Sequence, residues 1–155
     1  MTIEVGDRAP AFHLQTDGAS AIKLAALKGK NVVLYFYPKD NTSGCTAQAC
    51  AFRDLHPKFK KLNAVVIGVS RDSVKSHDGF KDKYKLPFAL GADEDGKVSA
   101  AYGTWIKKSM YGRSYMGMER ATFLIDKQGV IRNAWRKVKV PGHIDEVLEA
   151  LKALD

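Results

Sequence analysis

The sequence predicts an α/β protein with a central mixed β-sheet and helices on both faces of the sheet. Two apolar runs, residues 31–37 and 64–70, are rich in β-branched and aromatic residues, which is typical of strands buried on both sides. A helical pattern follows each of these runs. Residues 121–125 and 130–135 flank a turn, which predicts a hairpin. This order of strands and helices predicts a layered sheet.

The size and composition fit one soluble globular domain spanning residues 1–155, with 45% hydrophobic and 27% charged residues. No stretch approaches 18 apolar residues, so we expect no membrane partner. The first residues lack a basic head followed by an apolar core, so we expect no signal peptide and a cytoplasmic location.

The net charge is +8, from 25 basic and 17 acidic residues, but the bases come in short scattered groups. No nucleic-acid-binding motif accompanies them, so we interpret them as a solvated surface and expect no nucleic-acid partner. Two cysteines are too few for a disulfide scaffold or a cysteine-based zinc site, and the four histidines lack ligand spacing. We therefore expect no metal.

The first half of the chain supplies the element on which the function depends. Residues 6–14 are expected to be extended, with Phe12 and Leu14 pointing inward. Pro38 should end the strand at 31–37, because proline cannot donate to a sheet ladder. The following helix has its apolar face at Phe52, Leu55, Phe59 and Leu62, and Pro57 should kink it or split it near His56.

The second half continues the alternation of strands and helices. Asp72 and Ser73 can start a helix. Residues 86–90 are expected to form a short strand, which Pro87 places at a sheet edge or at a strand start. We expect a short helix at 98–102 and a polar and aromatic loop at 107–117. The chain closes with an amphipathic helix whose apolar face carries Ile144, Val147, Leu148, Leu151 and Leu154.

Cys45 lies where the buried strand ends and the helix begins. Thr42 is a good N-cap residue, which makes Cys45 the third residue of the helix. The first-turn N–H groups lack partners within the helix and carry partial positive charge, so they stabilise a thiolate. Most free cysteines are small buried hydrophobes, but the strand end, the cap and the first-turn position together favour a reactive thiol.

The motif Pro38-x-x-x-Thr42-x-x-Cys45 resembles the active-site motif of the peroxiredoxins. Cys50, five residues later, matches the branch called peroxiredoxin Q or bacterioferritin comigratory protein. Residues 102–105, 108–112 and 115–126 are also similar to that branch, so the resemblance covers nearly the whole chain. It implies a thioredoxin-like fold and an antioxidant thiol peroxidase.

The resemblance also implies roles for individual residues. Cys45 would be the peroxidatic cysteine and Cys50 the resolving cysteine, and a Cys45–Cys50 disulfide would be reduced by thioredoxin or a similar dithiol. Thr42 and Arg120 would donate hydrogen bonds to the peroxide, and Pro38 would exclude water. Gln48 stands where the family often has Glu, so its role would be limited to neutral hydrogen bonding. The family implies no cofactor, and the branch implies a monomer.

Three other functions stay open at this stage. A thioredoxin-like disulfide reductase normally has Cys-x-x-Cys, whereas four residues separate these cysteines. A Cys–His hydrolase would pair Cys45 with His56, His77 or His143, and a basic binding protein would consume no peroxide. Trp105, Met110, Tyr111 and Met116 are expected either to line an apolar entrance for peroxides or to pack in the core.

Overall fold

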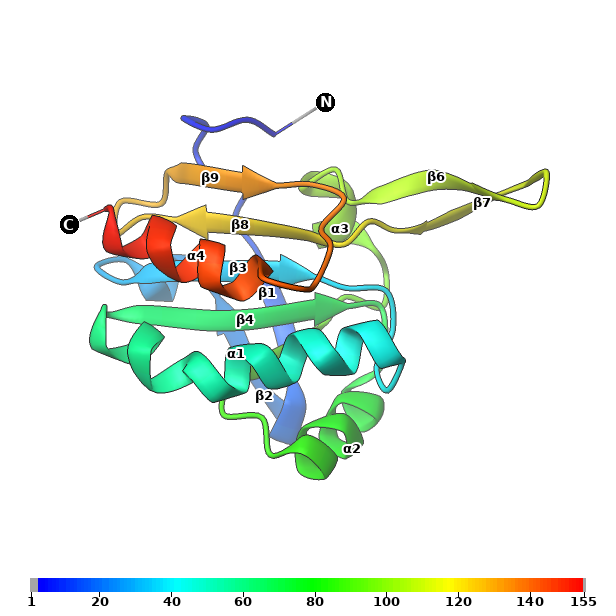
Figure 1. Cartoon of the computed structure of the whole chain (residues 1–155), viewed down its shortest axis with the longest axis horizontal. Helices are drawn as coiled ribbons and strands as arrows, with labels where there is room; N and C mark the ends of the chain where they lie inside the picture. Colours follow the sequence, from blue (N-terminus) through cyan, green and yellow to red (C-terminus); the bar gives the residue numbers. More distant parts are fainter. Residues whose placement is uncertain (1–2, 155) are drawn as a thin grey trace.

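The computed structural model describes residues 3–154 and has a seven-stranded mixed sheet at its centre (Figure 1). The strand order is β2-β1-β5-β4-β3-β8-β9, and β6 and β7 form a separate two-stranded hairpin. The strands are β1 His13–Thr16, β2 Ser20–Lys23, β3 Asn31–Phe36, β4 Ala64–Ser70, β5 Ala89–Ala92, β6 Trp105–Met110, β7 Arg113–Met118, β8 Ala121–Ile125 and β9 Ile131–Trp135. The helices are α1 Ser43–Lys61, α2 Val74–Tyr84, α3 Lys97–Ala101 and α4 His143–Lys152, with short 3₁₀ turns at Asp17–Ala19 and Leu24–Leu27.

Strand β3 lies at the centre of the sheet, as the apolar run predicts. It pairs in parallel with β4 and antiparallel with β8, which places Val33 between Val66 and Leu124. All six residues of β3 are buried. β-Branched and aromatic side chains suit this position because each one packs on a pleated surface covered on both sides.

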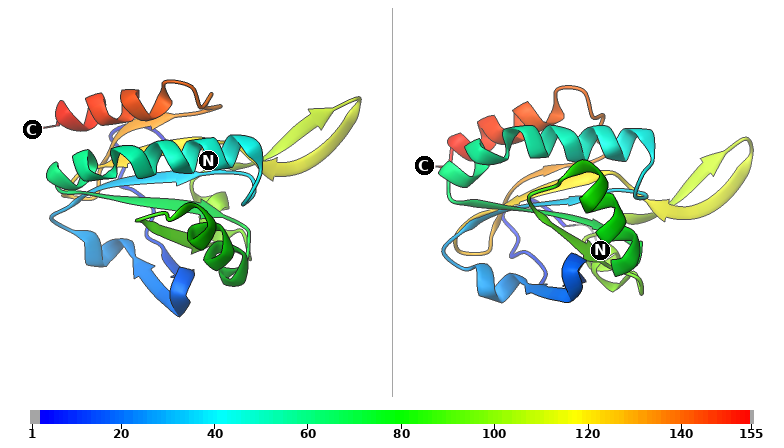
Figure 2. Two further views of the ribbon diagram at one scale, coloured as in Figure 1. Left: turned by 60° about the horizontal axis from the view of Figure 1, so that its bottom comes forward. Right: turned by 90° about the horizontal axis from the view of Figure 1, so that it is seen from below.

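The side chains of β3 alternate between two hydrophobic clusters, one on each face of the sheet. Val33 and Tyr35 pack in a cluster with residues of α1, α2 and α4, whereas Val32 and Leu34 pack with residues of the segment before β1 and with Tyr102 after α3. Helices α1 and α4 lie side by side over the first face (Figure 2). The prediction of a thioredoxin-like mixed sheet with helices on both faces is confirmed.

Helix α1 runs without interruption through Pro57, so the prediction of a split near His56 is wrong. Proline removes one backbone hydrogen bond, but Pro57 is exposed, and water can satisfy the carbonyl group that loses its partner. Phe52 and Phe59, on either side of it, are both fully buried, with ring centroids 5.8 Å apart. Their packing holds the helix on the sheet across the proline.

Two segments differ from the sequence predictions. The strand expected at 86–90 begins two residues after Pro87, at Ala89, and it lies inside the sheet between β1 and β4 instead of at an edge. The loop expected at 107–117 is the β6–β7 hairpin, which projects from the body of the molecule (Figure 1). Tyr111 and Gly112, both with positive φ, form its two-residue turn. The sequence pattern did not predict these strands, because both are largely exposed and their apolar and polar residues do not alternate.

The remaining helices agree with their predictions. Ser73 caps α2 by accepting a hydrogen bond from the Ser76 N–H, and the amphipathic C-terminal helix buries Ile144, Val147, Leu148 and Leu151. Within residues 3–154, no helix combines the length and apolar character needed to cross a membrane.

Candidate active site

Cys45 is the third residue of α1, as predicted, and its side chain is only 1% exposed. Thr42 precedes the helix with extended backbone, and its carbonyl accepts the first helical hydrogen bond from the Thr46 N–H at 2.9 Å. The Thr42 hydroxyl does not cap the helix; it donates to the Lys39 carbonyl at 2.8 Å instead. The first-turn N–H groups near the sulfur are therefore not taken up by this side chain.

Arg120 reaches Cys45 from a part of the chain 75 residues away. It directly precedes β8, and because β8 pairs with β3, it is placed near the end of the strand that leads to Cys45. Its Nη2 donates to the Cys45 sulfur at 3.4 Å. Gly44 allows this approach, since a Cβ atom there would lie 3.1 Å from Nη2. The site thus combines a buried thiol with a guanidinium donor.

Gln48 accepts a hydrogen bond from the other terminal nitrogen of the same guanidinium. Its Oε1 accepts from Arg120 Nη1 at 2.6 Å, and its side chain is fully buried one turn of α1 after Cys45. The predicted neutral hydrogen-bonding role is confirmed for this contact. Its amide nitrogen has no hydrogen-bond partner among the described residues. Arg120 is therefore oriented by an amide oxygen that faces it from the helix.

Tyr35 is a residue of the site region that the sequence analysis missed. Its ring stacks on Phe52 at 4.6 Å, and its buried hydroxyl has no hydrogen-bond partner within residues 3–154. Burial raises the pKa of Tyr35 well above its usual range, and negative charge at Cys45 and Asp40 raises it further. The phenol therefore stays neutral and keeps a free donor. A tyrosine in an otherwise apolar central strand was the available signal.

Cys50 lies on the same continuous helix and is partly buried, and both cysteines are free thiols. Five residues along an α-helix separate two Cα atoms by roughly 8–9 Å and turn the side chains to different faces. A disulfide needs Cα atoms within about 7 Å. The structure therefore represents the reduced protein, in which Cys45 faces the core and Cys50 does not.

Pro38 and Thr42 are both exposed in the loop between β3 and α1. Beside Arg120, a groove runs between the β6–β7 hairpin and the segment after β9, and it is lined by Ile106, Lys107, Tyr115, Lys137 and Val138, among others. Trp105, Met110, Tyr111 and Met116 do not line this groove. Met110, Tyr111 and Met116 are 55%, 98% and 52% exposed, so the core-packing alternative is wrong for them.

The histidines do not support a Cys–His hydrolase. His77 contacts Asp40, His143 contacts Thr122 at 2.8 Å, and the His56 ring lies near that of Phe88. Burial lowers the pKa of His143. The group that contacts the Cys45 sulfur is Arg120, a cation that can donate to a thiolate but cannot act as a base at neutral pH.

The fold and this site define a thioredoxin-like α/β protein with a buried free thiol near a helix N-terminus, contacted by an arginine. The model of the AhpC/TSA family matches residues 5–134. Peroxiredoxin Bcp of Bacillus subtilis is 52% identical over 152 residues, which are 98% of this chain and 97% of that protein.

Solved structures show the same similarity. A PrxQ mutant of Xylella fastidiosa is 43% identical with a TM-score of 0.94, over 99% of this chain and 98% of that one. The bacterioferritin comigratory protein of Xanthomonas campestris is 46% identical with a TM-score of 0.88, over 92% and 90% of the two chains. The chain therefore belongs to the AhpC/TSA family and, within it, to the Bcp or peroxiredoxin Q branch of the peroxiredoxins, which are thiol peroxidases.

We expect Thr42→Val to lower the rate constant for peroxide reduction roughly 10- to 1000-fold, because the resemblance implies that its hydroxyl donates to the peroxide. The measurement is stopped-flow oxidation of the reduced protein by hydrogen peroxide. Thr46→Val is a matched control on the same helix, because the Thr46 hydroxyl has no hydrogen-bond partner among the described residues. An unchanged rate for Thr42→Val would remove Thr42 from the mechanism.

Proposed function

We propose that this peroxiredoxin reduces hydrogen peroxide and organic hydroperoxides to water and alcohols through Cys45, in antioxidant defence. The observation that carries the proposal is the 3.4 Å contact between Arg120 Nη2 and the buried Cys45 sulfur at the start of α1. The Xanthomonas campestris relative, whose structure is described in connection with alkyl peroxide reduction activity, supports organic hydroperoxides as substrates.

In the first step, the Cys45 thiolate attacks one peroxide oxygen. The S–O bond forms as the O–O bond breaks, and the leaving oxygen takes a proton to become water or an alcohol, leaving Cys45 sulfenic acid. A free thiol with a pKa near 8.5 is about 3% thiolate at pH 7, so full ionisation gains only roughly 30-fold. Enzymatic accelerations start at about a millionfold. Most of the acceleration must therefore come from orientation and charge stabilisation.

Arg120 is the group best placed to supply that stabilisation. Its guanidinium already points at the sulfur, and Gln48 fixes its second arm, so little reorganisation is needed when charge develops on the leaving oxygen. First-turn N–H groups add donors, the Thr42 hydroxyl adds one when it leaves the Lys39 carbonyl, and Pro38 shapes the loop and excludes water.

In the second step, the Cys50 thiol condenses with Cys45 sulfenic acid, releasing water and forming the disulfide. The first two turns of α1 must unwind for this, because the intact helix keeps the two sulfurs apart. Thioredoxin or a similar dithiol then reduces the disulfide to two thiols and is itself oxidised. We propose that residues 1–155 act as a single domain and a cytoplasmic monomer, with no cofactor and no nucleic-acid or membrane partner.

The test is to add one equivalent of hydrogen peroxide to the reduced protein and to measure its intact mass. We expect a loss of two hydrogens, because one disulfide forms. An unchanged mass with both thiols free would contradict the proposed function.

We expect Cys50→Ser to consume about one equivalent of peroxide and then to stop as a sulfenic acid, which dimedone traps and mass spectrometry detects.

The oxidised parent protein should have less helical circular dichroism and faster amide exchange around residues 42–50, since local opening lies below global unfolding in free energy. Normal turnover of Cys50→Ser with thioredoxin, or no loss of helix on oxidation, would show that Cys50 does not resolve the sulfenic acid within this helix.

A further inference from the structure

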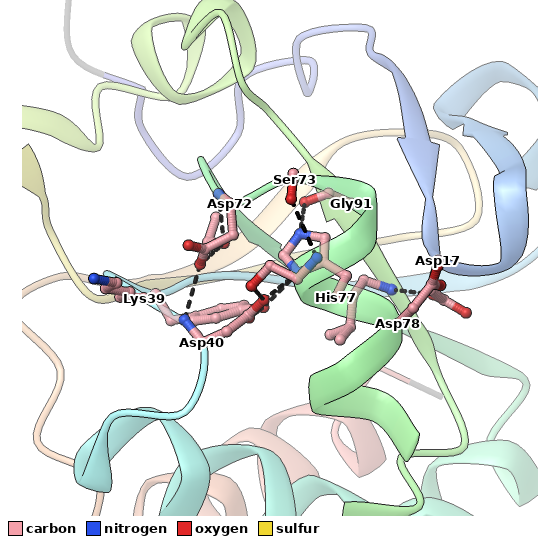
Figure 3. A network of polar contacts seen from close by, with 12 residues as sticks. Asp17, Lys39, Asp40, Asp72, Ser73, His77, Asp78 and Gly91 are labelled. Carbon is pink, nitrogen blue, oxygen red and sulfur yellow. Dashed lines mark hydrogen bonds and ion pairs between the residues drawn. The ribbon is translucent and has the colours of Figure 1, made fainter. Parts of the chain in front are cut away.

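Asp40 lies in the loop between β3 and α1, close to His77 and Asp72 (Figure 3), and four hydrogen bonds connect it to neighbouring residues. Its side chain is only 2% exposed. Its carboxylate accepts from the Tyr37 hydroxyl at 2.6 Å, from the Ser76 hydroxyl at 2.8 Å and from His77 Nδ1 at 2.7 Å. Its backbone N–H donates to the Asp72 carboxylate at 2.8 Å. The loop is therefore attached to helix α2 and to the segment that precedes it.

Both ring nitrogens of His77 face hydrogen-bond acceptors. Nδ1 faces Asp40 and Nε2 faces the Gly91 carbonyl at 2.9 Å. A neutral imidazole has only one N–H, so only the protonated ring donates to both acceptors. Asp40 and His77 thus form an ion pair, and the His77 side chain is fully buried.

The charged groups around His77 favour its protonation. They are the carboxylate of Asp40, in the loop, and that of Asp72, which precedes α2. The neutral Tyr37 hydroxyl, after β3, also lies 3.5 Å from Nδ1. Burial alone would lower the pKa of His77, but the hydrogen bond and the negative charge of Asp40 outweigh it, and the net pKa is raised. His77 therefore stays protonated below that raised pKa, and its ion pair with the Asp40 carboxylate is lost as the pH rises through it.

The hydrogen bonds of Asp40 lie directly before the residues that lead to Cys45. Asn41, Thr42 and Ser43, which follow Asp40, are exposed, and the Thr42 hydroxyl bonds only within the loop, to Lys39. Cys45 lies five residues after Asp40. Asp40 is thus the anchor between the fixed part of the molecule and the turns of α1 that must unwind.

We propose that the buried Asp40–His77 pair is a clamp that holds the start of α1 in its helical conformation for peroxide attack and opposes the unwinding that disulfide formation requires. Asp40 and His77 are positioning residues: they act through the loop and do not touch the reacting atoms. The proposal rests on the two-step chemistry given above. Weakening the clamp should slow the first step and leave the second unchanged or faster.

The experiment measures the two steps separately. Sulfenic acid formation is followed in the Cys50→Ser background, and disulfide formation is followed by rapid-quench mass spectrometry with both cysteines present. We expect His77→Gln to slow sulfenic acid formation about 10- to 100-fold, the scale of a displaced reacting group, with no decrease in the rate of disulfide formation. A decrease of both rates by one factor, or no change in either, would overturn the clamp.

Milder variants keep the test valid if His77→Gln does not fold. Ser76→Ala removes one of the three donors to Asp40 and should change the two rates in the same directions by a smaller factor, and Ser76→Thr should restore them. Ser73→Ala is the matched control, because it weakens the cap of α2 without a contact to Asp40. It should lower the melting temperature only; rate changes as large as those of Ser76→Ala would show general destabilisation and refute the clamp.

The pH profile gives a further readout. In the parent protein, sulfenic acid formation should slow at pH values above the pKa of His77, and His77→Gln should lack this decline. A decline that persists in folded His77→Gln would overturn the assignment to His77. Failure of the clamp can be distinguished from failure of the proposed function, because the proposed function fails if the protein with both cysteines forms no disulfide with peroxide.

Discussion

Cys45→Ser is expected to abolish peroxidase turnover and to leave the fold intact. Serine replaces a side chain of similar size that is 1% exposed, and the Arg120 guanidinium can donate to a hydroxyl as it does to the sulfur. A hydroxyl is not ionised at neutral pH and cannot form a sulfenic acid, so the first step has no nucleophile. The measurement is peroxide consumption coupled to thioredoxin, with circular dichroism to check the fold.

The matched control for this variant is Cys50→Ser, which removes the other thiol from the same helix. It should retain one rapid equivalent of peroxide consumption, whereas Cys45→Ser should show none. Turnover of Cys45→Ser above about 1% of the parent rate would place the catalytic thiol elsewhere. Such a variant would have lost less than about a hundredfold in rate, whereas enzymatic rate enhancements start at about a millionfold.

Arg120→Met is expected to have the second largest effect, slowing sulfenic acid formation about 100- to 1000-fold, as the loss of a charge-stabilising donor does in other enzymes. The variant removes the donor to Cys45 and leaves the buried Gln48 Oε1 without the cation it faces. Reduction of the disulfide by thioredoxin should change much less, because no peroxide oxygen carries charge in that step. Stopped-flow measurement of each half-reaction gives the comparison.

Two further variants show whether the effect of Arg120→Met comes from the lost donors at Cys45. Arg120→Lys keeps the charge but not the planar pair of donors that spans Cys45 and Gln48, so it should lie between the parent and Arg120→Met. Arg132→Met removes an arginine whose ion pair is with Asp126, on the β8–β9 turn, and should leave both half-reactions unchanged. Equal slowing of both half-reactions in Arg120→Met would indicate a structural role.

Features that depend on local sequence agree with the structure. The buried strand at 31–36, the N-cap position of Thr42 and the inward face of Cys45 follow from side-chain shape and helical spacing over a few residues. Local spacing also separates the two cysteines, and so predicts that α1 must open before they can meet. The motif around Cys45 was sufficient to indicate the family.

Features that depend on the sheet order were decided by the tertiary structure. Without the resemblance, Arg120 would be interpreted as a surface cation, because only the pairing of β8 with β3 places it at Cys45, 75 residues away. The hairpin at 105–118 was missed because its strands are largely exposed and have no apolar alternation.

The Asp40–His77 pair shows most clearly what only the tertiary structure decided. The sequence places Asp40 in a loop of turn-forming residues and His77 in a predicted helix, and it gives no reason to connect them. Helix α2 carries His77 to Asp40, and strand β5 presents the Gly91 carbonyl to the second ring nitrogen. The sequence predicts, through a local pattern, that Cys45 is the reacting thiol; the tertiary structure decided its partners, because they are brought together by strand pairing and burial over long separations.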